Sequence, residues 1–318
     1  MQTNRRAVID VGTNSVKLLV ADVSGGVVQP VLEESEQTRL GAGFYETSRL
    51  QPQAIAQTAQ AVASLLGKAR GLQAASTRVV ATSAARDALN PEDLTSAVER
   101  ACGLKVEIIS GEQEADWGFQ GVTTDPELAQ QPLLLLDVGG GSTEFILGHG
   151  EHKHFRKSFK LGTVRLLEKL PPGDPPTAQQ LADCRGWVRE FLDREVREEL
   201  DAAMKREIDS SADDGVVQLV GTGGTATIMG RMEGKLESFD RQRIEAVRLT
   251  LPQLRAHVER LWGMPLAERK TIVGLPAKRA DVILPGVVIY EGVMERFGFS
   301  ELRVSTRGLR FAALMDGA

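Results

Sequence analysis

The sequence predicts an α/β protein made of two related domains. Segments typical of strands and helices alternate along its 318 residues, and at roughly 150 residues per domain this length gives about two domains. An apolar strand, a glycine-rich turn and a second strand occur twice, and Asp10 to Ser15 aligns with Asp137 to Ser142 so that an aspartate, a glycine and a serine match. The copies lie too far apart for a solenoid repeat, so they indicate two domains of one type.

The first half predicts strands and helices in alternation. Runs of apolar and β-branched residues predict the strands, and Gly25-Gly26 is typical of a turn between two of them. Asn90 followed by Pro91 predicts a helix start, and Gly103 predicts the end of that helix. In order, we expect strands at 7–11, 16–23 and 27–33, a helix at 51–70, a strand at 77–82, a helix from 91 to 102, a strand at 105–109 and a helix that opens at 110–112.

The second half repeats this opening and continues in the same way. Thr177 is typical of a helix N-cap, and the Glu and Arg residues that follow, three and four positions apart, indicate a solvated helix face. Pro285 predicts a kink in the last long helix. In order, we expect strands at 133–138 and 143–147, a helix at 177–208, a strand at 216–220, a glycine-rich turn at 221–225 before a helix, helices at 251–262 and 276–297, a strand at 301–305 and a closing helix at 308–315.

Composition narrows the class of protein. Apolar residues make up 42% and charged residues 25%, which excludes disordered, collagenous and disulfide-stabilised classes. The 43 acidic and 38 basic side chains give a net charge of −5, so we expect no binding of nucleic acid or of a membrane through bulk charge. Cys102 and Cys184 match no metal or redox spacing, and no signal peptide or membrane-spanning stretch is recognisable. We therefore expect a cytoplasmic protein.

Three glycine-rich turns each follow an apolar strand, at 12–15, 139–142 and 221–225. A Gly-x-x-Ser turn presents backbone N–H groups with no side chain in the way, and such concave backbone binds phosphate oxygens. Most glycine turns are simply turns, but three of them in one chain indicate a phosphate site. The candidate phosphate-binding residues are Gly12, Thr13, Asn14, Ser15, Gly139, Gly140, Gly141, Ser142, Gly223 and Gly224.

Carboxylates accompany two of these turns. Asp10 and Asp137 end their strands at matching places, and Glu144 follows the second turn. A carboxylate at the end of a buried strand is costly unless a cation compensates it, and Mg²⁺ or Mn²⁺ prefers carboxylate, water and phosphate oxygens. The alternative is that each aspartate only caps its own turn. Lys17 aligns with Glu144, which indicates either a cation for the substrate or an exposed strand lysine.

The turns resemble the phosphate and adenosine motifs of the superfamily of actin, heat-shock 70 proteins and sugar kinases. Ala81 to Arg86 and Ile108 to Ala115 more narrowly resemble the Ppx/GppA family of exopolyphosphatases and guanosine pentaphosphate phosphohydrolases. The similarity extends to Arg279-Ala280-Asp281 and to Leu302 to Ser305 near the end of the chain.

The resemblance implies two ribonuclease H-like domains that face a cleft. We expect the boundary where prolines interrupt the pattern, near 124–131. The first domain then covers 1–125 and is joined by the C-terminal helix at 306–318, and the second covers 126–305. Longer members of the family carry a further helical C-terminal region, so we expect a short form that prefers short or medium polyphosphate.

The resemblance also implies roles for single residues. Glu114 corresponds to the base that activates water, Arg86 to the residue that holds the terminal phosphates, and Arg279 to a second phosphate ligand. The motif from Asp137 to Glu144 supplies metal ligands and phosphate donors. From spacing alone, Glu112 is an equal candidate for the base, because residues two apart on a helix point to different faces.

The expected function is a magnesium-dependent exopolyphosphatase that releases terminal orthophosphate from inorganic polyphosphate. One alternative is a guanosine pentaphosphate phosphohydrolase, which breaks the same kind of bond. Alternatives of another class are a small-molecule kinase with this fold and a non-catalytic sensor of guanosine tetraphosphate or polyphosphate. We also expect a homodimer.

Overall fold

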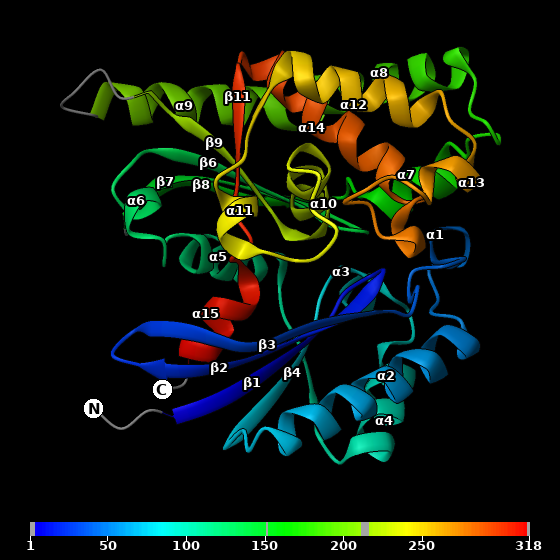
Figure 1. Cartoon of the computed structure of the whole chain (residues 1–318), viewed down its shortest axis with the longest axis vertical. Coiled ribbons are helices and arrows are strands. Elements are labelled where there is room, and N and C mark those ends of the chain that lie inside the picture. The colour runs from blue at the N-terminus through cyan, green and yellow to red at the C-terminus, as the bar shows by residue number, and fades with distance from the viewer. Residues whose placement is uncertain (1–3, 151, 211–215, 317–318) are drawn as a thin grey trace. The chain divides into compact units, whose positions relative to one another are not determined.

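The structure is a computed structural model of the chain and describes residues 4–150, 152–210 and 216–316. The chain divides into two compact units. Unit 1 holds the described residues up to Thr124 together with those from Arg307 onward, and unit 2 runs from Asp125 to Thr306. Each unit is built around one β-sheet (Figure 1).

Unit 1 contains a five-stranded sheet in the order β3-β2-β1-β4-β5. The strands are β1 (Asn4–Val11), β2 (Ser15–Ser24), β3 (Val27–Gln37), β4 (Ser76–Ala81) and β5 (Val106–Ile108). β1, β4 and β5 are parallel, whereas β2 and β3 pair antiparallel. The carboxyl ends of the three parallel strands therefore meet at one edge of the sheet, where ligands bind in open α/β sheets.

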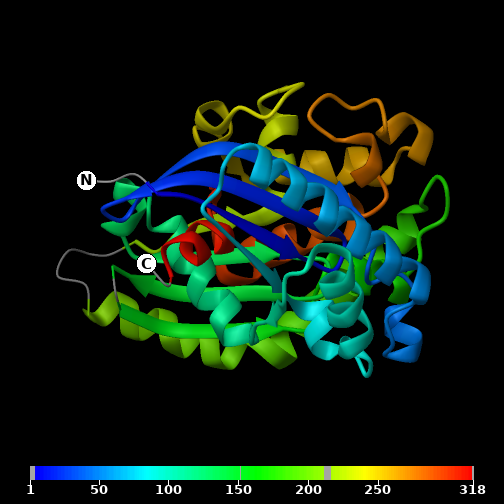
Figure 2. The same cartoon turned by 90° about the horizontal axis from the view of Figure 1, so that it is seen from below.

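Helices cover both faces of this sheet. They are α1 (Phe44–Thr47), α2 (Pro52–Gly71), α3 (Ser83–Asp87), α4 (Pro91–Cys102), α5 (Gly111–Val122) and α15 (Leu309–Met315). Side chains alternate along β1, so that Ile9 packs with α2 and α4 while Val8 packs with α15. Figures 1 and 2 show α2 and α15 on opposite sides of the strands. The last helix of the chain thus completes the core of unit 1.

Unit 2 contains a six-stranded sheet in the order β10-β11-β9-β6-β7-β8. The strands are β6 (Leu133–Val138), β7 (Thr143–His149), β8 (His152–Phe159), β9 (Gln218–Thr222), β10 (Arg248–Thr250) and β11 (Glu301–Val304). β6, β9 and β11 are parallel, so their carboxyl ends also share one edge. The helices are α6 (Pro126–Ala129), α7 (Thr163–Lys169), α8 (Ala178–Phe191), α9 (Arg197–Ser210), α10 (Gly223–Glu233), α11 (Arg241–Glu245), α12 (Leu251–Trp262), α13 (Leu266–Arg269) and α14 (Ile283–Phe297).

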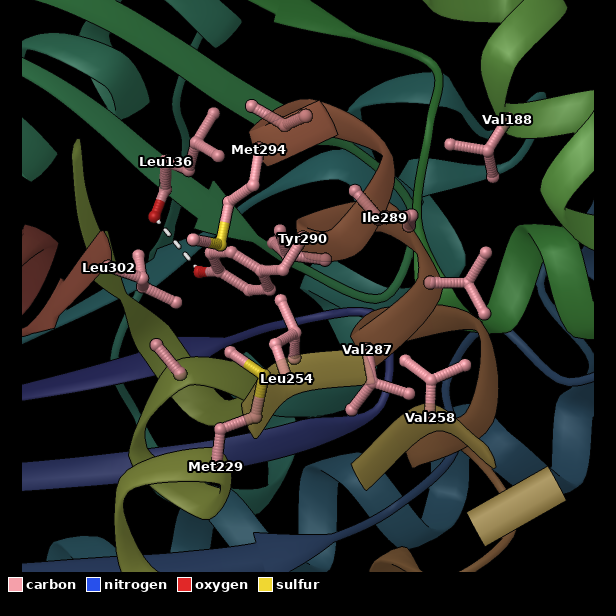
Figure 3. Packing of buried hydrophobic residues seen from close by; sticks show 14 of the residues in the cluster. Leu136, Val188, Met229, Leu254, Val258, Val287, Ile289, Tyr290, Met294 and Leu302 are labelled. Atoms are coloured by element: carbon pink, nitrogen blue, oxygen red, sulfur yellow. Dashed lines mark hydrogen bonds between the residues drawn. The ribbon is translucent and has the colours of Figure 1, made fainter. Parts of the chain in front are cut away.

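Tyr290 lies at the centre of the core of unit 2. It projects from α14 and packs among Leu136, Leu254, Met294 and other apolar residues (Figure 3). Its hydroxyl oxygen lies 3.2 Å from the carbonyl oxygen of Leu136 and 3.3 Å from that of Thr222. The fully buried phenol therefore holds together the carboxyl ends of β6 and β9, next to the second glycine turn.

The long helix expected at 177–208 is present with an interruption. Thr177 caps α8 as predicted, because its side chain accepts from the N–H of Gln180. A π-helical turn, η1 (Leu192–Val196), then joins α8 to α9. The combined helix runs along one side of the sheet of unit 2 (Figure 2).

The helix start predicted at Asn90 and Pro91 is confirmed, since Asn90 is the N-cap residue of α4. Its side chain, however, bonds to the backbone N–H and carbonyl oxygen of Leu50 and not to a backbone N–H of the first turn of the helix.

Two local predictions are wrong. Pro285 causes no interior kink, since α14 begins at Ile283 and the first turn of a helix needs no N–H from proline. The segment 221–225 is not a free turn, because α10 already begins at Gly223.

We expect Gly121→Ala to destabilise the protein. Gly121 lies in α5, and a Cβ atom there would lie 2.0 Å from the carbonyl oxygen of Gly308, just before α15. The two segments would have to separate, which should lower the free energy of unfolding in urea by about 1–3 kcal/mol. Gly67→Ala in α2 is the matched control: a Cβ there meets nothing within 4 Å, and alanine favours a helix interior by about 0.5–1 kcal/mol. Equal stability of G121A and the wild type would contradict the close packing.

Candidate active site

The repeated motif forms the same hairpin turn in both units. In unit 1 the N–H of Gly12 donates to the carbonyl oxygen of Ser15 at 3.0 Å, and in unit 2 the N–H of Gly139 donates to that of Ser142 at 3.0 Å. The two aligned copies therefore share the same turn hydrogen bond. This bond also means that the first glycine of each motif shapes the turn with its amide.

The next amides of each turn are the donors available to a phosphate. Those of Thr13 and Asn14, and those of Gly140 and Gly141, donate to no backbone oxygen in the described ranges. Successive N–H groups in a tight turn form a concave anion site. This geometry fits the phosphate-binding role that the sequence predicts for both turns.

The residues across from each aspartate differ between the units. Asp10 lies opposite Lys17 on β2, and Asp137 lies opposite Glu144 on β7. Directly opposed residues of antiparallel strands project from the same face of the sheet. Unit 1 therefore pairs its carboxylate with a cation, and unit 2 pairs it with a second carboxylate.

Several buried polar atoms at the carboxyl edge of unit 1 have no hydrogen-bond partner among the described residues. They are Asp10 Oδ1, Asn14 Nδ2, Ser15 Oγ and Ser83 Oγ. The N–H of Thr82 donates to the carbonyl oxygen of Val11 at 3.2 Å, which ties the end of β4 to the end of β1. Folded proteins rarely leave such buried atoms unpaired. The set is what a bound cation and phosphate oxygens would satisfy.

Asp10 is the charged member of this set. Burial raises the pKa of its carboxyl above the ordinary value of 3.8, and the nearby charges of Lys17 and Arg310 lower it in part. Arg310 projects from α15 and donates to the carbonyl oxygen of Leu18 at 2.9 Å. A buried carboxylate with an unpartnered oxygen and incomplete compensation fits a cation ligand.

Arg86 and Glu114 are brought together beside this edge. Arg86 lies in α3, directly after β4, and Glu114 lies in the first turn of α5, after β5. Arg86 Nη1 donates to Glu114 Oε2 at 2.9 Å and to the carbonyl oxygen of Ile109 at 3.1 Å. Ser110 fixes the start of α5, because its side chain accepts from the N–H of Gln113.

The structure also separates the two candidates for the base. The side chain of Glu114 is only 13% exposed and faces Arg86, whereas Glu112 is exposed. The half-buried carboxylate in a fixed position is the better placed of the two for general-base chemistry. Geometry thus favours the residue that the family resemblance implies.

Asp137 in unit 2 packs against the start of α10. Gly223 has a φ of +79°, and a Cβ atom there would lie 2.1 Å from Asp137 Oδ1, so only glycine fits. Thr225 Oγ1 donates to the carbonyl oxygen of Val138 at 3.1 Å and fixes this helix start on β6. Gly223 therefore lets the start of α10 lie close to the aspartate, whereas a Cβ atom at Gly224 would meet nothing within 4 Å.

Glu144 is buried and held by two hydroxyl groups. Ser142 Oγ and Ser158 Oγ both donate to Glu144 Oε1 at 2.7 Å. Ser158 comes from β8, a strand that the sequence did not predict, and it stood outside the candidate residues. The two bonds fix the carboxylate on the same face of the sheet as Asp137.

Helix α7, which sequence reasoning missed, holds the second glycine turn from outside. The N–H groups of Thr163 and Val164 donate to the carbonyl oxygens of Gly139 and Gly140 at 3.0 and 2.8 Å, and Arg165 Nε donates to that of Gly141 at 2.8 Å. A Cβ atom at residue 162 would lie 2.5 Å from the carbonyl oxygen of residue 140, so glycine is required there too. The turn's carbonyls thus point to α7.

The predicted metal ligands are divided between the units. Asp10 belongs to unit 1, and Asp137 and Glu144 belong to unit 2. Over the part of the chain that the structure describes, no three His, Cys, Asp or Glu side chains form a group that could hold a metal ion. Magnesium usually takes one or two carboxylates and completes its shell with water and phosphate. The chemistry of these carboxylates fits that mode of binding.

Arg279 lies in the 3₁₀ turn η2 (Ala277–Arg279), shortly before α14. Its part in phosphate binding stays a prediction.

None of the described helices is long and apolar enough to cross a membrane.

Two α/β units, each with a glycine turn and an aspartate at the carboxyl end of a central strand, define a protein of the two-domain ribonuclease H-like class. The sequence profile described as the Ppx/GppA phosphatase family matches residues 19–317, and the chain belongs to this family. The predicted membership and the predicted hydrolase class are thereby confirmed.

Similarity to individual proteins agrees with this family membership. The chain is 34% identical to Exopolyphosphatase 2 of Mycobacterium tuberculosis over 96% of both chains. It is 28% identical to Exopolyphosphatase 1 of that species over 96% of this chain and 86% of the relative. The crystal structure of an Aquifex aeolicus member of the Ppx/GppA family covers 98% of this chain and 97% of its own, with a TM-score of 0.76 and 30% identity. This similarity confirms the predicted fold.

We expect Asp10→Asn to stabilise the protein at pH 7 in the presence of a chelator. Because the folded-state pKa of Asp10 is raised, the folded protein keeps the proton over a pH window above 3.8 in which the unfolded chain has lost it. Stability therefore falls as pH rises through that window. Asparagine has no such proton to lose, so the free energies of unfolding measured from pH 4 to 8 should diverge in favour of the variant as pH rises.

Asp22→Asn, on the neighbouring strand β2, is the matched control. Arg5 donates to both carboxylate oxygens of Asp22, at 2.8 and 2.9 Å, and this lowers the pKa of Asp22. The stabilisation is present above the ordinary pKa and is lost as pH falls, so D22N should be less stable than the wild type at pH 7. Parallel pH profiles of D10N and D22N would contradict the burial of Asp10.

Proposed function

We propose that the protein is an exopolyphosphatase that removes terminal orthophosphate from inorganic polyphosphate. The observation that carries the proposal is the Arg86–Glu114 pair, which stands beside an edge of unit 1 rich in unpartnered buried polar atoms. Similarity to two mycobacterial proteins named exopolyphosphatases supports the choice of substrate.

Hydrolysis of a phosphoanhydride needs an in-line water, a group that orients and deprotonates it, and positive charge around the phosphoryl oxygens. In the proposed reaction, water attacks the terminal phosphorus and Glu114 accepts its proton. The bridging P–O bond breaks, which leaves orthophosphate and a chain one phosphate shorter. Arg86 and the amides of Thr13 and Asn14 hold the phosphoryl oxygens.

Magnesium is part of this proposal. Asp137 and Glu144, and separately Asp10, are the residues that would hold it. When bound, it would neutralise charge on the phosphoryl oxygens. Ser142 and Ser158 orient Glu144 for that task through the two hydroxyl bonds.

A panel of substrates tests the function. Purified protein with MgCl₂ should release orthophosphate from polyphosphates of graded length, and more slowly or not at all from ATP in the presence or absence of a sugar. Faster release from guanosine pentaphosphate than from every polyphosphate would move the assignment to the guanosine pentaphosphate phosphohydrolases. Phosphate transfer to a hydroxyl acceptor, or binding without turnover, would overturn it.

We expect Glu114→Gln to lose polyphosphate hydrolysis by at least about 100-fold, because general-base catalysis contributes roughly that much or more. Glu112→Gln is the matched control, since it removes the same charge two residues away from an exposed position. It should keep at least about half of the wild-type kcat. An active E114Q together with an inactive E112Q would show that the base is Glu112.

A further inference from the structure

The ion pair of Arg86 and Glu114 joins two groups whose proposed tasks conflict. As a phosphate ligand, Arg86 needs its N–H donors directed at the substrate. As a base, Glu114 needs an oxygen directed at water. In the structure the two side chains are bonded to each other at 2.9 Å.

Both side chains of the pair are partly buried. The side chain of Arg86 is 21% exposed and that of Glu114 13%. Nη1 of Arg86 is shared between Glu114 and the carbonyl oxygen of Ile109, and Nε lies 4.0 Å from Asp87 Oδ1. Nη1 is thus directed toward the start of α5, while Nε lies near the end of α3.

While the pair is intact, Oε2 of Glu114 accepts a hydrogen bond from Arg86, so that this oxygen is not available to a water. A terminal phosphate offers the guanidinium two oxygens in the planar, bidentate geometry that suits it. It can replace the single bond to Glu114 with a stronger pair of bonds.

We propose that the Arg86–Glu114 pair is a resting-state lock that the terminal phosphate opens, so that binding of the substrate frees the base. This inference rests on the proposed function. The lock makes activation of water depend on a phosphate seated at Arg86. It therefore protects against hydrolysis of ligands that occupy the turn at 12–15 without reaching the arginine.

Binding experiments separate the lock from a purely positioning role. If Glu114 competes with phosphate for Arg86, removing its charge should tighten binding; if Glu114 only orients Arg86, removing it should weaken binding. We would titrate inorganic tripolyphosphate by calorimetry in EDTA, where turnover is blocked, into the wild type, E114Q and E112Q. An ion pair near the surface contributes about 1 kcal/mol. Because phosphate must break this pair in the wild type and not in E114Q, the variant should bind about fivefold more tightly.

E112Q controls for the loss of one negative charge near a polyanion, and its affinity should stay within about twofold of the wild type. Glu114→Ala, which removes the side-chain acceptor and leaves Arg86 only the carbonyl oxygen of Ile109 at Nη1, should bind at least as tightly as E114Q. In wild-type protein, the arginine ¹⁵Nε signal assigned to Arg86 through R86K should shift on addition of tripolyphosphate. This last readout does not depend on the folding of a Glu114 variant.

The outcomes are distinct. A wild type that hydrolyses and binds polyphosphate, with E114Q binding no more tightly than E112Q, would overturn the lock and leave the proposed function intact. An unshifted Arg86 signal at saturating tripolyphosphate would also overturn the lock. A wild type that neither binds nor hydrolyses any polyphosphate would overturn the lock and the function together.

Discussion

The hydrogen bond from the first glycine amide of each repeated turn to the serine carbonyl three residues later is the constraint on which the two half-sites depend. It closes the turn at the carboxyl end of β1 in unit 1 and of β6 in unit 2. Once it is made, the next two amides cannot join the sheet and remain for an anion. The same turn fixes the register, so that each aspartate and its cross-strand partner share one face of the sheet.

The same strand, turn and strand occur in both units, and the units differ in the side chains that each adds to this framework. Unit 1 adds a cation opposite the aspartate and places Arg86 and Glu114 on helices that follow the next two parallel strands. Unit 2 adds a second carboxylate, Glu144, which accepts hydrogen bonds from two serines. The buried hydroxyl of Tyr290 bonds to a carbonyl oxygen on β6, the strand that carries Asp137. The charge of Asp137 contributes, after burial, to raising the pKa of Tyr290 well above 10, which keeps the phenol a neutral donor. The net charge of −5 belongs to the whole chain, and it does not describe the local charges at these two sheet edges.

The sequence predicts the features that have a local signature. Long strands, α2, α12 and the matched turns follow from periodicity and glycine placement, and the register of the repeat follows from one aligned aspartate. Helix α7 is not predicted, because its seven residues are too few to show a helical periodicity. Its contact with the second glycine turn, where the backbone at Gly162 lies against that of the turn, is not visible in the sequence. Ser158 lies on an unpredicted strand. The choice between Glu112 and Glu114 depends on which side chain meets Arg86, a contact across 28 positions of sequence.

Phosphate and metal are proposed to bind at the carboxyl edges of the two sheets. Anomalous diffraction from crystals of the Glu114→Gln variant, grown with MnCl₂ and tripolyphosphate, would locate both ligands. We expect a manganese peak roughly 2.0–2.6 Å from a carboxylate oxygen of Asp10, Asp137 or Glu144, with phosphate density at Arg86 or the amides of residues 13–14 or 140–141. Manganese and phosphate bound together at a place that touches none of these residues would contradict this proposal.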